Sequence, residues 1–268
     1  MRVATVCIAK NEDRYIDEWV QYNLLLGVDQ VVVYMNDWTY DFSAYGGRVL
    51  AIDAPGEAMQ FKAYNHFLRR LSGGYDFALV FDADEYLVLR RHENVKDLLA
   101  EYEDYQSVAF NWRLFGDSGL AAPAGEQYSC LGRFVTCERG LNRHVKVAVN
   151  CGKLDGRQFF CNPHCLSGSL RGENVTIDPT KTRYVYGPFN EGADVESAPA
   201  YIAHYRSKTR QEWIDNKIPK GKADFAKTDP CYYGYSNMQE FEDSNLNEVT
   251  DTSALDFFRK ALARKIAE

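Results

Sequence analysis

The stretch "FALVFDADEYLVL", residues 77–89, places three acids within four positions between two apolar runs. The first run is typical of a buried strand, and Asp82, Asp84 and Glu85 follow at its end. Side chains two apart in an extended chain point to the same side, so Asp82 and Asp84 can face one point. Close carboxylates repel unless a cation lies between them, and their oxygens favour Mg²⁺ or Mn²⁺. The stretch predicts a divalent-metal site, with a solvated acidic turn as the alternative.

Strands and helices alternate over the first 120 residues. Apolar and β-branched runs predict strands at 2–8, 29–36, 48–53, 76–82 and 107–115. Apolar residues at helical spacing predict helices at 12–26, 58–74 and 94–105. This alternation indicates right-handed crossovers and an α/β fold with a mainly parallel, Rossmann-like sheet. Ligands of such sheets bind outside the carboxyl ends of the strands, which is where the three acids lie.

Residues 121–268 show a looser pattern. Shorter strands are predicted at 144–150, 156–162 and 182–187, and helices at 208–217 and 253–267. The sequence contains no internal repeat and no low-complexity linker. We therefore expect a single domain over residues 1–268, with a first half at 1–120 and a second half at 121–268.

Composition limits the class of protein. The chain has 31 basic and 38 acidic residues and a net charge of −7, so no nucleic-acid partner is expected. Seven cysteines in a chain with no recognisable export signal indicate free thiols in a reducing cytosol. No segment approaches the roughly 18 apolar residues of a membrane span. A cytoplasmic location is expected, with at most peripheral contact at the inner face of the membrane.

Four segments carry a family resemblance. They are "AKNEDRYIDEWVQYNLLLGVDQVVVYMND" (9–37), "FDADEYLVL" (81–89), "NWRLFGDSG" (111–119) and "HYRSKTRQEW" (204–213). Together they resemble the glycosyltransferase family 2-like group of GT-A enzymes, related to the family 92 glycosyltransferases. The resemblance implies a GT-A fold with a C-terminal extension on the acceptor side. It also implies a nucleotide-diphosphate sugar donor, usually a UDP-sugar, and inverting transfer to a hydroxyl of a glycan or lipid-linked glycan acceptor.

The resemblance further suggests a galactose donor and a role in bacterial surface polysaccharide synthesis. It implies that the residues contacting the donor nucleotide are Lys10, Asn11, Glu12, Asn36, Asp37, Gln60, Lys62 and Lys208. Simpler explanations exist for several of them. Asn11 is equally well explained as a helix cap, Asn36 and Asp37 as a turn, and Lys62 as a solvated helix lysine.

A third metal ligand is usual in this fold and is often a late histidine. His204 and His164 both qualify, because a neutral imidazole can bind manganese. His204 is preferred, since Arg206 and Lys208 beside it would serve as charge partners of a diphosphate. His164 is also a candidate for binding substrate. Either histidine could instead be purely structural.

Inverting transfer needs a base that takes the proton of the acceptor hydroxyl. Asp117 in "WRLFGDSG" is the first candidate, because it follows a strand in a glycine-flanked turn beside Trp112, which could stack on a sugar. Glu138 and Glu85 are rival candidates, and an ordinary turn aspartate is the alternative for Asp117.

Two other functions compete. A nucleotidyltransferase also needs a parallel sheet and paired acids, but commonly has a glycine-rich loop after its first strand, and "CIAKNEDRY" contains no glycine. A non-catalytic glycan-binding protein would use the 18 tyrosines and 4 tryptophans but leaves the acids at the strand end unexplained.

Overall fold

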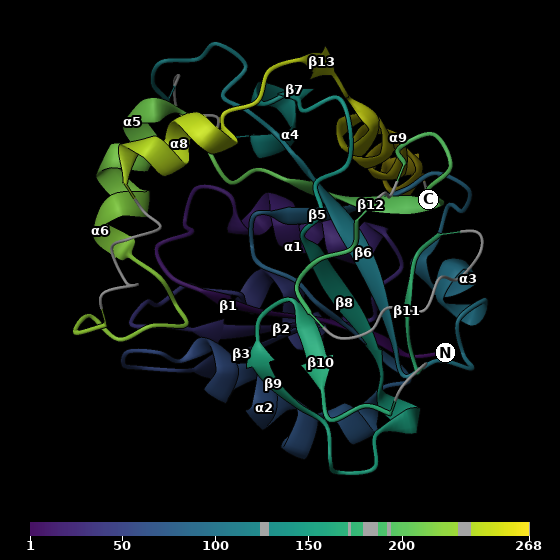
Figure 1. Ribbon diagram of the computed structural model, residues 1–268. Helices are drawn as coiled ribbons and strands as arrows, with labels where there is room; N and C mark the ends of the chain where they lie inside the picture. The colour runs from purple at the N-terminus through teal and green to yellow at the C-terminus, as the bar shows by residue number, and fades with distance from the viewer. Residues whose placement is uncertain (124–128, 171–172, 179–186, 192–193, 230–236, 268) are drawn as a thin grey trace.

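A computed structural model describes the chain except for residues 124–128, 171–172, 179–186, 192–193, 230–236 and 268 (Figure 1). The main strands are β1 (Val3–Ala9), β2 (Gln30–Met35), β3 (Val49–Asp53), β4 (Phe77–Val80), β5 (Glu85–Leu89), β6 (Ser107–Leu114), β8 (Val145–Asn150), β11 (Asn174–Thr176) and β12 (Ala200–His204). They form one sheet in the order β3-β2-β1-β4-β8-β6-β12-β5, with β11 beside β6.

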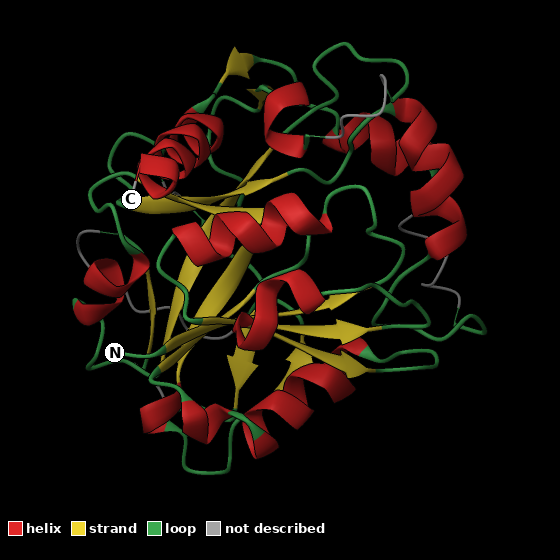
Figure 2. Ribbon diagram, turned by 180° about the vertical axis from the view of Figure 1, so that it is seen from behind, coloured by secondary structure: helices red, strands yellow, loops and turns green. Residues whose placement is uncertain are grey.

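Most neighbouring strands in this sheet are parallel. The first four strands in the spatial order are parallel to one another, as are β12 and β11 to β6, whereas β8 is antiparallel to β4 and β6, and β5 is antiparallel to β12. Helices lie on both faces (Figures 1 and 2). The predicted α/β architecture, a Rossmann-like sheet flanked by helices as in the GT-A fold, is confirmed.

Further elements complete the structure. The helical segments are α1 (Ile16–Leu25), α2 (Gln60–Arg70), α3 (Val95–Ala100), α4 (Cys130–Arg133), α5 (Arg210–Glu212), η4 (Trp213–Lys217), α6 (Ile218–Lys220), α8 (Met238–Ser244) and α9 (Ser253–Ala267), with short 3₁₀ turns at Ser43–Arg48, Ser72–Gly74 and Cys151–Lys153. Two small antiparallel pairs join β9 (Phe159–Asn162) to β10 (Cys165–Ser167) and β7 (Thr136–Cys137) to β13 (Val249–Thr250).

The strand sequences explain why the sheet is covered on both faces. All seven residues of β1 are buried, and they alternate between two cores. Val3 and Cys7 belong to a core that includes side chains of α1 and α3, whereas Val6 belongs to one shared with α2 and β9. A strand buried on both sides needs an apolar residue at nearly every position, which is the pattern that predicted it.

Most predicted boundaries lie within a few residues of the observed ones. The helix predicted from residue 12 begins at Ile16, and the helix predicted to reach 105 ends at Ala100. The predicted helix 208–217 is divided into α5 and the π-helical turn η4, and α6 continues it. The predicted strand 182–187 falls almost entirely outside the described residues. Among the strands of the main sheet, β5, β11 and β12 were not predicted.

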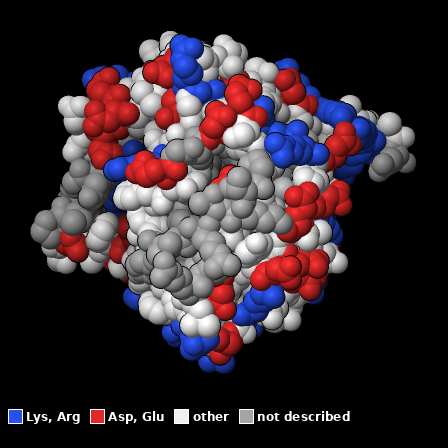
Figure 3. Space-filling view, turned by 45° about the vertical axis from the view of Figure 1, so that its right-hand side comes forward, with Lys and Arg blue, Asp and Glu red and all other residues white. Residues whose placement is uncertain are grey.

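The cysteines that the structure describes form no disulfide with one another, and Cys231 lies outside the described residues. Within the described part of the chain, no helix combines the length and the apolar character needed to cross a bilayer. Acidic and basic side chains are interspersed on the face drawn in Figure 3.

Candidate functional site

The three acids of the opening stretch lie at the turn between β4 and β5, where Asp82 and Asp84 belong to the turn and Glu85 is the first residue of β5. The turn is closed by two hydrogen bonds between its ends. The Glu85 backbone N–H donates to the Asp82 carbonyl (3.1 Å), and the Asp82 backbone N–H donates to a Glu85 carboxylate oxygen (2.9 Å). Because β4 runs parallel to β1, the turn lies at the edge where both strands present their carboxyl ends.

Asp82 is bound by donors from two other elements. Its Oδ1 accepts hydrogen bonds from Tyr64 Oη (3.0 Å) and Gln60 Nε2 (3.2 Å), both on α2. Its Oδ2 is 2.8 Å from the ammonium of Lys146 on β8, a lysine with no exposed surface. Burial acts to raise the pKa of the Asp82 carboxyl, but the Lys146 ammonium outweighs it and the pKa is lowered. Asp82 is therefore ionised and held in place.

Glu85 lies behind the turn, 1% exposed. Its carboxylate is 3.8 Å from the Lys146 ammonium, yet burial raises the pKa of Glu85 well above its usual value. It lines none of the three cavities described below. This burial gives no access to a substrate hydroxyl, so the geometry offers no support for Glu85 as the base.

Asp84 lies beside the His204 imidazole and the Lys217 ammonium, both from the second half of the chain. Its Oδ1 lies 3.5 Å from His204 Nε2 and its Oδ2 lies 3.7 Å from Lys217 Nζ. β12 pairs with β5 so that His204 is opposite Glu85, which brings the imidazole beside the turn. Burial opposes ionisation of Asp84, but His204 and Lys217 lower its pKa well below the usual range.

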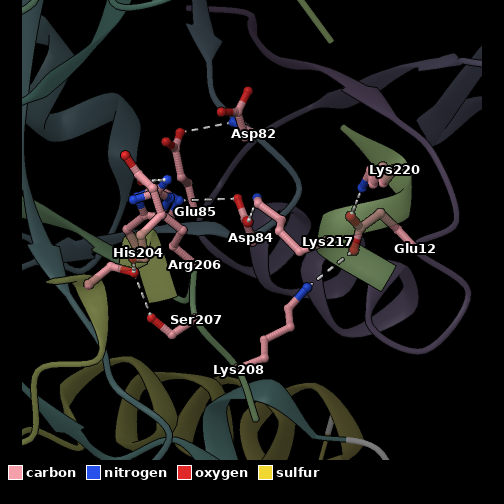
Figure 4. Close-up of polar contacts among 12 residues, drawn as sticks. Glu12, Asp82, Asp84, Glu85, His204, Arg206, Ser207, Lys208, Lys217 and Lys220 are labelled. Carbon is pink, nitrogen blue, oxygen red and sulfur yellow. Dashed lines mark hydrogen bonds and ion pairs between the residues drawn. The ribbon is translucent and has the colours of Figure 1, made fainter. Parts of the chain in front are cut away.

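Three lysines, Lys208, Lys217 and Lys220, face the acids across the site, and we call them the lysine row (Figure 4). Glu12, in the loop after β1, pairs with Lys208 (3.3 Å) and with Lys220. These two ammonium groups outweigh the burial of Glu12 and lower its pKa. Lys217 stands beside Asp84, and burial lowers its pKa to about 8. Lys208 was predicted, whereas Lys217 and Lys220 were missed; the lysine-rich run "NKIPKGK" (216–222) was the available signal.

The row is held by a well-capped helical segment. Thr209 and Glu212 form a capping box at the start of α5, in which Glu212 N donates to Thr209 Oγ1 (3.1 Å) and Thr209 N donates to Glu212 Oε2 (3.2 Å). Arg206 pairs with Glu240 and lies 5.5 Å from the Trp213 ring centre. The cations that face the acids are therefore fixed to a folded element.

Three adjoining cavities surround the acids and the lysines. The first, about 270 Å³, lies between the loop after β1 and α5–η4, and the second, about 280 Å³, is lined by Lys10, Asn36 and Asp37. The third, about 170 Å³, contains both Asp82 and Asp84. Lys220 lines all three. Shared lining residues place the three cavities side by side at the carboxyl edge of the sheet, and we refer to them together as the cleft.

Most predicted donor-side residues border this cleft. Glu12 and Lys208 line its first cavity, and Gln60 lines the third. Asn36 also has the structural role proposed as its alternative, since its Nδ2 donates to the carbonyls of Ala54 and Gly56 (both 2.8 Å). Asp37 Oδ1 accepts from the Gly56 N–H (2.9 Å), and its Oδ2 is 3.3 Å from Lys10 Nζ.

Several residues with a left-handed backbone conformation lie around the cleft. Among the described residues, five that are not glycine have positive φ, and four of them, Asn11 (53°), Asp37 (46°), Ala58 (52°) and Lys208 (52°), line the cleft. Such conformations cost energy and persist at functional sites. Asn11 is not the cap of the next helix, because α1 begins at Ile16 after an N-cap residue that makes no side-chain cap bond.

Lys62 lies away from the cleft. It is exposed on the outer face of α2, where it borders a separate groove with His66 and Arg69. The structure thus places it as the solvated helix lysine that was its alternative explanation.

Trp112 packs among three histidines at the edge of the third cavity. Its ring centre lies 4.3 Å from that of His204 and 5.0 Å from those of His164 and His144. His164 Nδ1 is 2.9 Å from the Val145 carbonyl, which can only accept, so the lone pair lies on Nε2. Burial lowers the pKa of His164 to about 3, so this imidazole is neutral. Trp112, His164 and His204 together form one wall of the third cavity.

The structure gives Asp117 the contacts of a turn aspartate. Its carboxylate accepts from Gly119 N (2.9 Å), Asn245 Nδ2 (2.9 Å) and Asn247 Nδ2 (3.1 Å). It lines none of the three cavities. Glu138 also lies outside them, and its Oε1 accepts from the Leu114 N–H (2.7 Å). Neither carboxylate is placed beside Asp84 to act on an acceptor there.

The metal prediction can be tested against the side chains present. No group of three or more possible metal ligands is assembled among the residues that the structure describes. Asp84 Oδ1 and His204 Nε2, 3.5 Å apart, are close enough for two ligands of one ion with bonds of about 2.0–2.2 Å. Ions of this type complete their shell with substrate phosphates and water. The residues therefore fit an ion that arrives with a diphosphate better than a resident one.

Comparisons with known proteins leave the family of the chain open. No protein-family model and no curated protein matches it. Among solved structures, TarS of S. aureus aligns with 46% of this chain and 23% of its own, at 18% identity and a TM-score of 0.32. A mycobacterial protein aligns with 42% of this chain and 41% of its own, at 20% identity and a TM-score of 0.30. The chain spans less than half the length of either. Scores this low leave the function to be inferred from the site.

Proposed function

We propose that the protein is a glycosyltransferase that binds a nucleotide-diphosphate sugar, with a UDP-sugar as the expected donor, together with Mn²⁺ or Mg²⁺. One observation carries the proposal. Asp84 and Glu12 each contact lysines from one folded segment, inside a cleft at the carboxyl edge of a Rossmann-like sheet. A diphosphate and a divalent ion would satisfy both sets of charges, because the ion binds carboxylates and the lysines bind phosphate oxygens.

The residues of the cleft have distinct roles in this proposal. Asp84 and His204 would hold the ion, which neutralises the charge of the departing diphosphate when it is bound. Lys208, Lys217 and Lys220 would exchange their present carboxylate partners for phosphate oxygens. The second cavity, with Lys10 and Asp37, has room for the nucleoside, and the aromatic wall of the third cavity would face the sugars.

The first prediction concerns donor binding. Isothermal titration of UDP-galactose, UDP-glucose and UDP-N-acetylglucosamine is expected to show binding that requires Mn²⁺ and that weakens at least tenfold in Asp84→Asn. The substitution keeps the size of the side chain but removes the charge that holds the ion. The sequence predicts the same loss for Asp82→Asn, although that change also removes the counter-ion of Lys146.

The control is Asp97→Asn, an exposed aspartate on α3. It should bind each UDP-sugar as the wild type does. Equal affinity in Asp84→Asn, or binding that is indifferent to Mn²⁺, would contradict the metal–diphosphate role of the turn. Binding of free sugars without any nucleotide would instead support a glycan-binding protein, and formation of a sugar nucleotide from UTP and a sugar phosphate would support a nucleotidyltransferase.

A further inference from the structure

Asp224 is a further carboxylate of the cleft, and no sequence motif pointed to it. It follows the lysine row, four residues after Lys220, and is half-buried. It lines the third cavity together with Asp84, Trp112 and His164. Asp224 therefore shares the space in which the donor sugar and its acceptor would meet.

The position of Asp224 is set by a chain of hydrogen bonds that includes the acid turn. The carbonyl of its neighbour Ala223 accepts from the backbone N–H of Gln60 (3.1 Å). The side chain of Gln60 donates in turn to Asp82 Oδ1 (3.2 Å). One residue of α2 thus ties the segment that carries Asp224 to the segment that carries Asp82.

Other carboxylates near the cleft are engaged by donors or cations. Glu12 is paired with two lysines, Asp82 with Lys146 and two donors from α2, and Asp84 with His204 and Lys217. In the part of the chain that the structure describes, the Asp224 side chain makes no ion pair within 4.0 Å and no hydrogen bond to another side chain, and the donor that acts on it is its own backbone N–H. Lys222 is the cation that acts on it most, from beyond ion-pair distance.

We propose that Asp224 is the general base that accepts the proton of the acceptor hydroxyl. This inference rests on the proposed function. As the acceptor O–H bond breaks, its proton passes to the Asp224 carboxylate and the oxygen forms a bond to the anomeric carbon of the donor. The bond from that carbon to the diphosphate breaks, and its electron pair leaves with the nucleoside diphosphate, where the lysine row meets the charge.

The electrostatic environment agrees with this role. Burial raises the pKa of the Asp224 carboxyl above its usual value, and Lys222 offsets the shift only in part. A carboxylate with a raised pKa is a stronger proton acceptor than an exposed one. Asp82 and Lys146 act on Asp224 in opposite directions and more weakly.

The test separates the chemical step from donor binding. The assay uses the UDP-sugar that the wild type binds with Mn²⁺. The rate of UDP release by Asp224→Asn is expected to be lower than the wild-type rate by a factor of about 10²–10⁴, the usual span for general-base catalysis. Its donor affinity, measured by titration, should stay within about threefold of the wild-type value. Asp224→Glu should keep more activity than Asp224→Asn. Asp215→Asn, an exposed aspartate of η4, is the matched control and should release UDP at the wild-type rate.

Azide gives a readout that a structural role would not move. It is an anionic nucleophile that needs no deprotonation, so it should restore UDP release by Asp224→Ala and yield the glycosyl azide. Two results would show that Asp224 is not the base and would leave the proposed function standing. They are wild-type turnover by Asp224→Asn, and loss of turnover in Asp117→Asn with donor affinity kept. Absence of UDP-sugar binding by the wild-type protein would overturn the proposed function and the base with it.

Discussion

At the scale of single residues, Lys146 occupies an unusual position for a lysine. It is a lysine on a central strand with no exposed surface, where a charge is expensive unless it is paired. Its partners, Asp82 and Glu85, are two of the three acids at the β4–β5 turn. The acids are evident from the sequence, but the lysine that compensates them is 64 positions beyond Asp82. Nothing in the local pattern around Lys146 distinguishes it from a solvated strand lysine.

Lys146→Met should therefore destabilise the fold strongly. Methionine fills a similar volume but leaves Asp82 and Glu85 without their buried cation, and breaking a buried pair costs about 3–5 kcal/mol. Urea unfolding followed by tryptophan fluorescence would measure the change. The double variant Lys146→Met with Asp82→Asn should recover part of the loss, because the uncompensated charge at Asp82 is then gone.

Lys62→Met, on the exposed face of α2, serves as the control and should change the free energy of unfolding by less than about 0.5 kcal/mol. A similarly small change in Lys146→Met would show that the contacts between Lys146 and the acid turn do not stabilise the fold.

The buried carboxyl of Glu138 should make the stability of the folded protein depend on pH. Burial raises its pKa to about 7, against about 4.3 in an unfolded chain, so the folded protein binds the extra proton between these values. The stability that Glu138 contributes is complete below about pH 4 and is lost as the pH rises through 7. Gln at this position can still accept from Leu114 N–H, but it does not titrate.

Melting temperatures of the wild type and Glu138→Gln, measured from pH 4 to pH 8, would test this. The wild type should lose stability relative to the variant as the pH rises. Two parallel curves would mean that Glu138 titrates normally in the folded protein.

At the scale of elements, the segment from β12 to α6 contributes most to the site. His204 ends β12, and Lys208, Lys217 and Lys220 follow within the next sixteen residues. The sequence predicted a helix here and identified Lys208, but not the π-helical turn η4, which shifts the register of the residues that follow. Regular helical spacing therefore could not predict which lysines face the acids.

The capping box of α5 offers a test at this scale. Thr209→Ala removes the hydroxyl that accepts from Glu212 N–H and should lower the free energy of unfolding by about 1 kcal/mol, within the 0.5–2 kcal/mol usual for an N-cap. Urea titration would measure it. Donor affinity should fall as well, because Lys208 immediately precedes the cap.

Thr209→Ser keeps the hydroxyl and should retain most of the stability of the wild type. If serine proved as damaging as alanine, the buried methyl group of Thr209, and not its hydrogen bonds, would be what holds the segment.

At the scale of the whole molecule, the two halves of the chain are interleaved in one sheet. β8 lies between β4 and β6, and β12 lies between β6 and β5. Six strands of the described sheet, β1 to β6, come from the first 120 residues, yet within that sheet β4 and β6 are joined through β8. The division into halves at residue 120 follows the sequence pattern and does not correspond to a break in the sheet (Figure 1).

A fragment of residues 1–120 should consequently fail to fold on its own. Without β8 and β12, β4 and β6 would lose their hydrogen-bonded neighbours in the sheet, and the ammonium that pairs with Asp82 would be absent. Thermal unfolding followed by circular dichroism should show no cooperative transition for the fragment and a sigmoidal one for the full chain. A cooperative transition in the fragment would establish an independent N-terminal domain and contradict the expected single domain.

The sequence alone determined the alternation of strands and helices, the Rossmann-like class and the acid turn at the end of β4. These follow from side-chain periodicity and local charge, which act over a few residues. Only the tertiary structure decided what meets the acids. Lys146, His204, Lys217 and Asp224 reach the turn because β8 and β12 enter the sheet beside strands far away in the sequence. The order of strands depends on packing both faces of the whole sheet at once, and no local pattern in the chain encodes it.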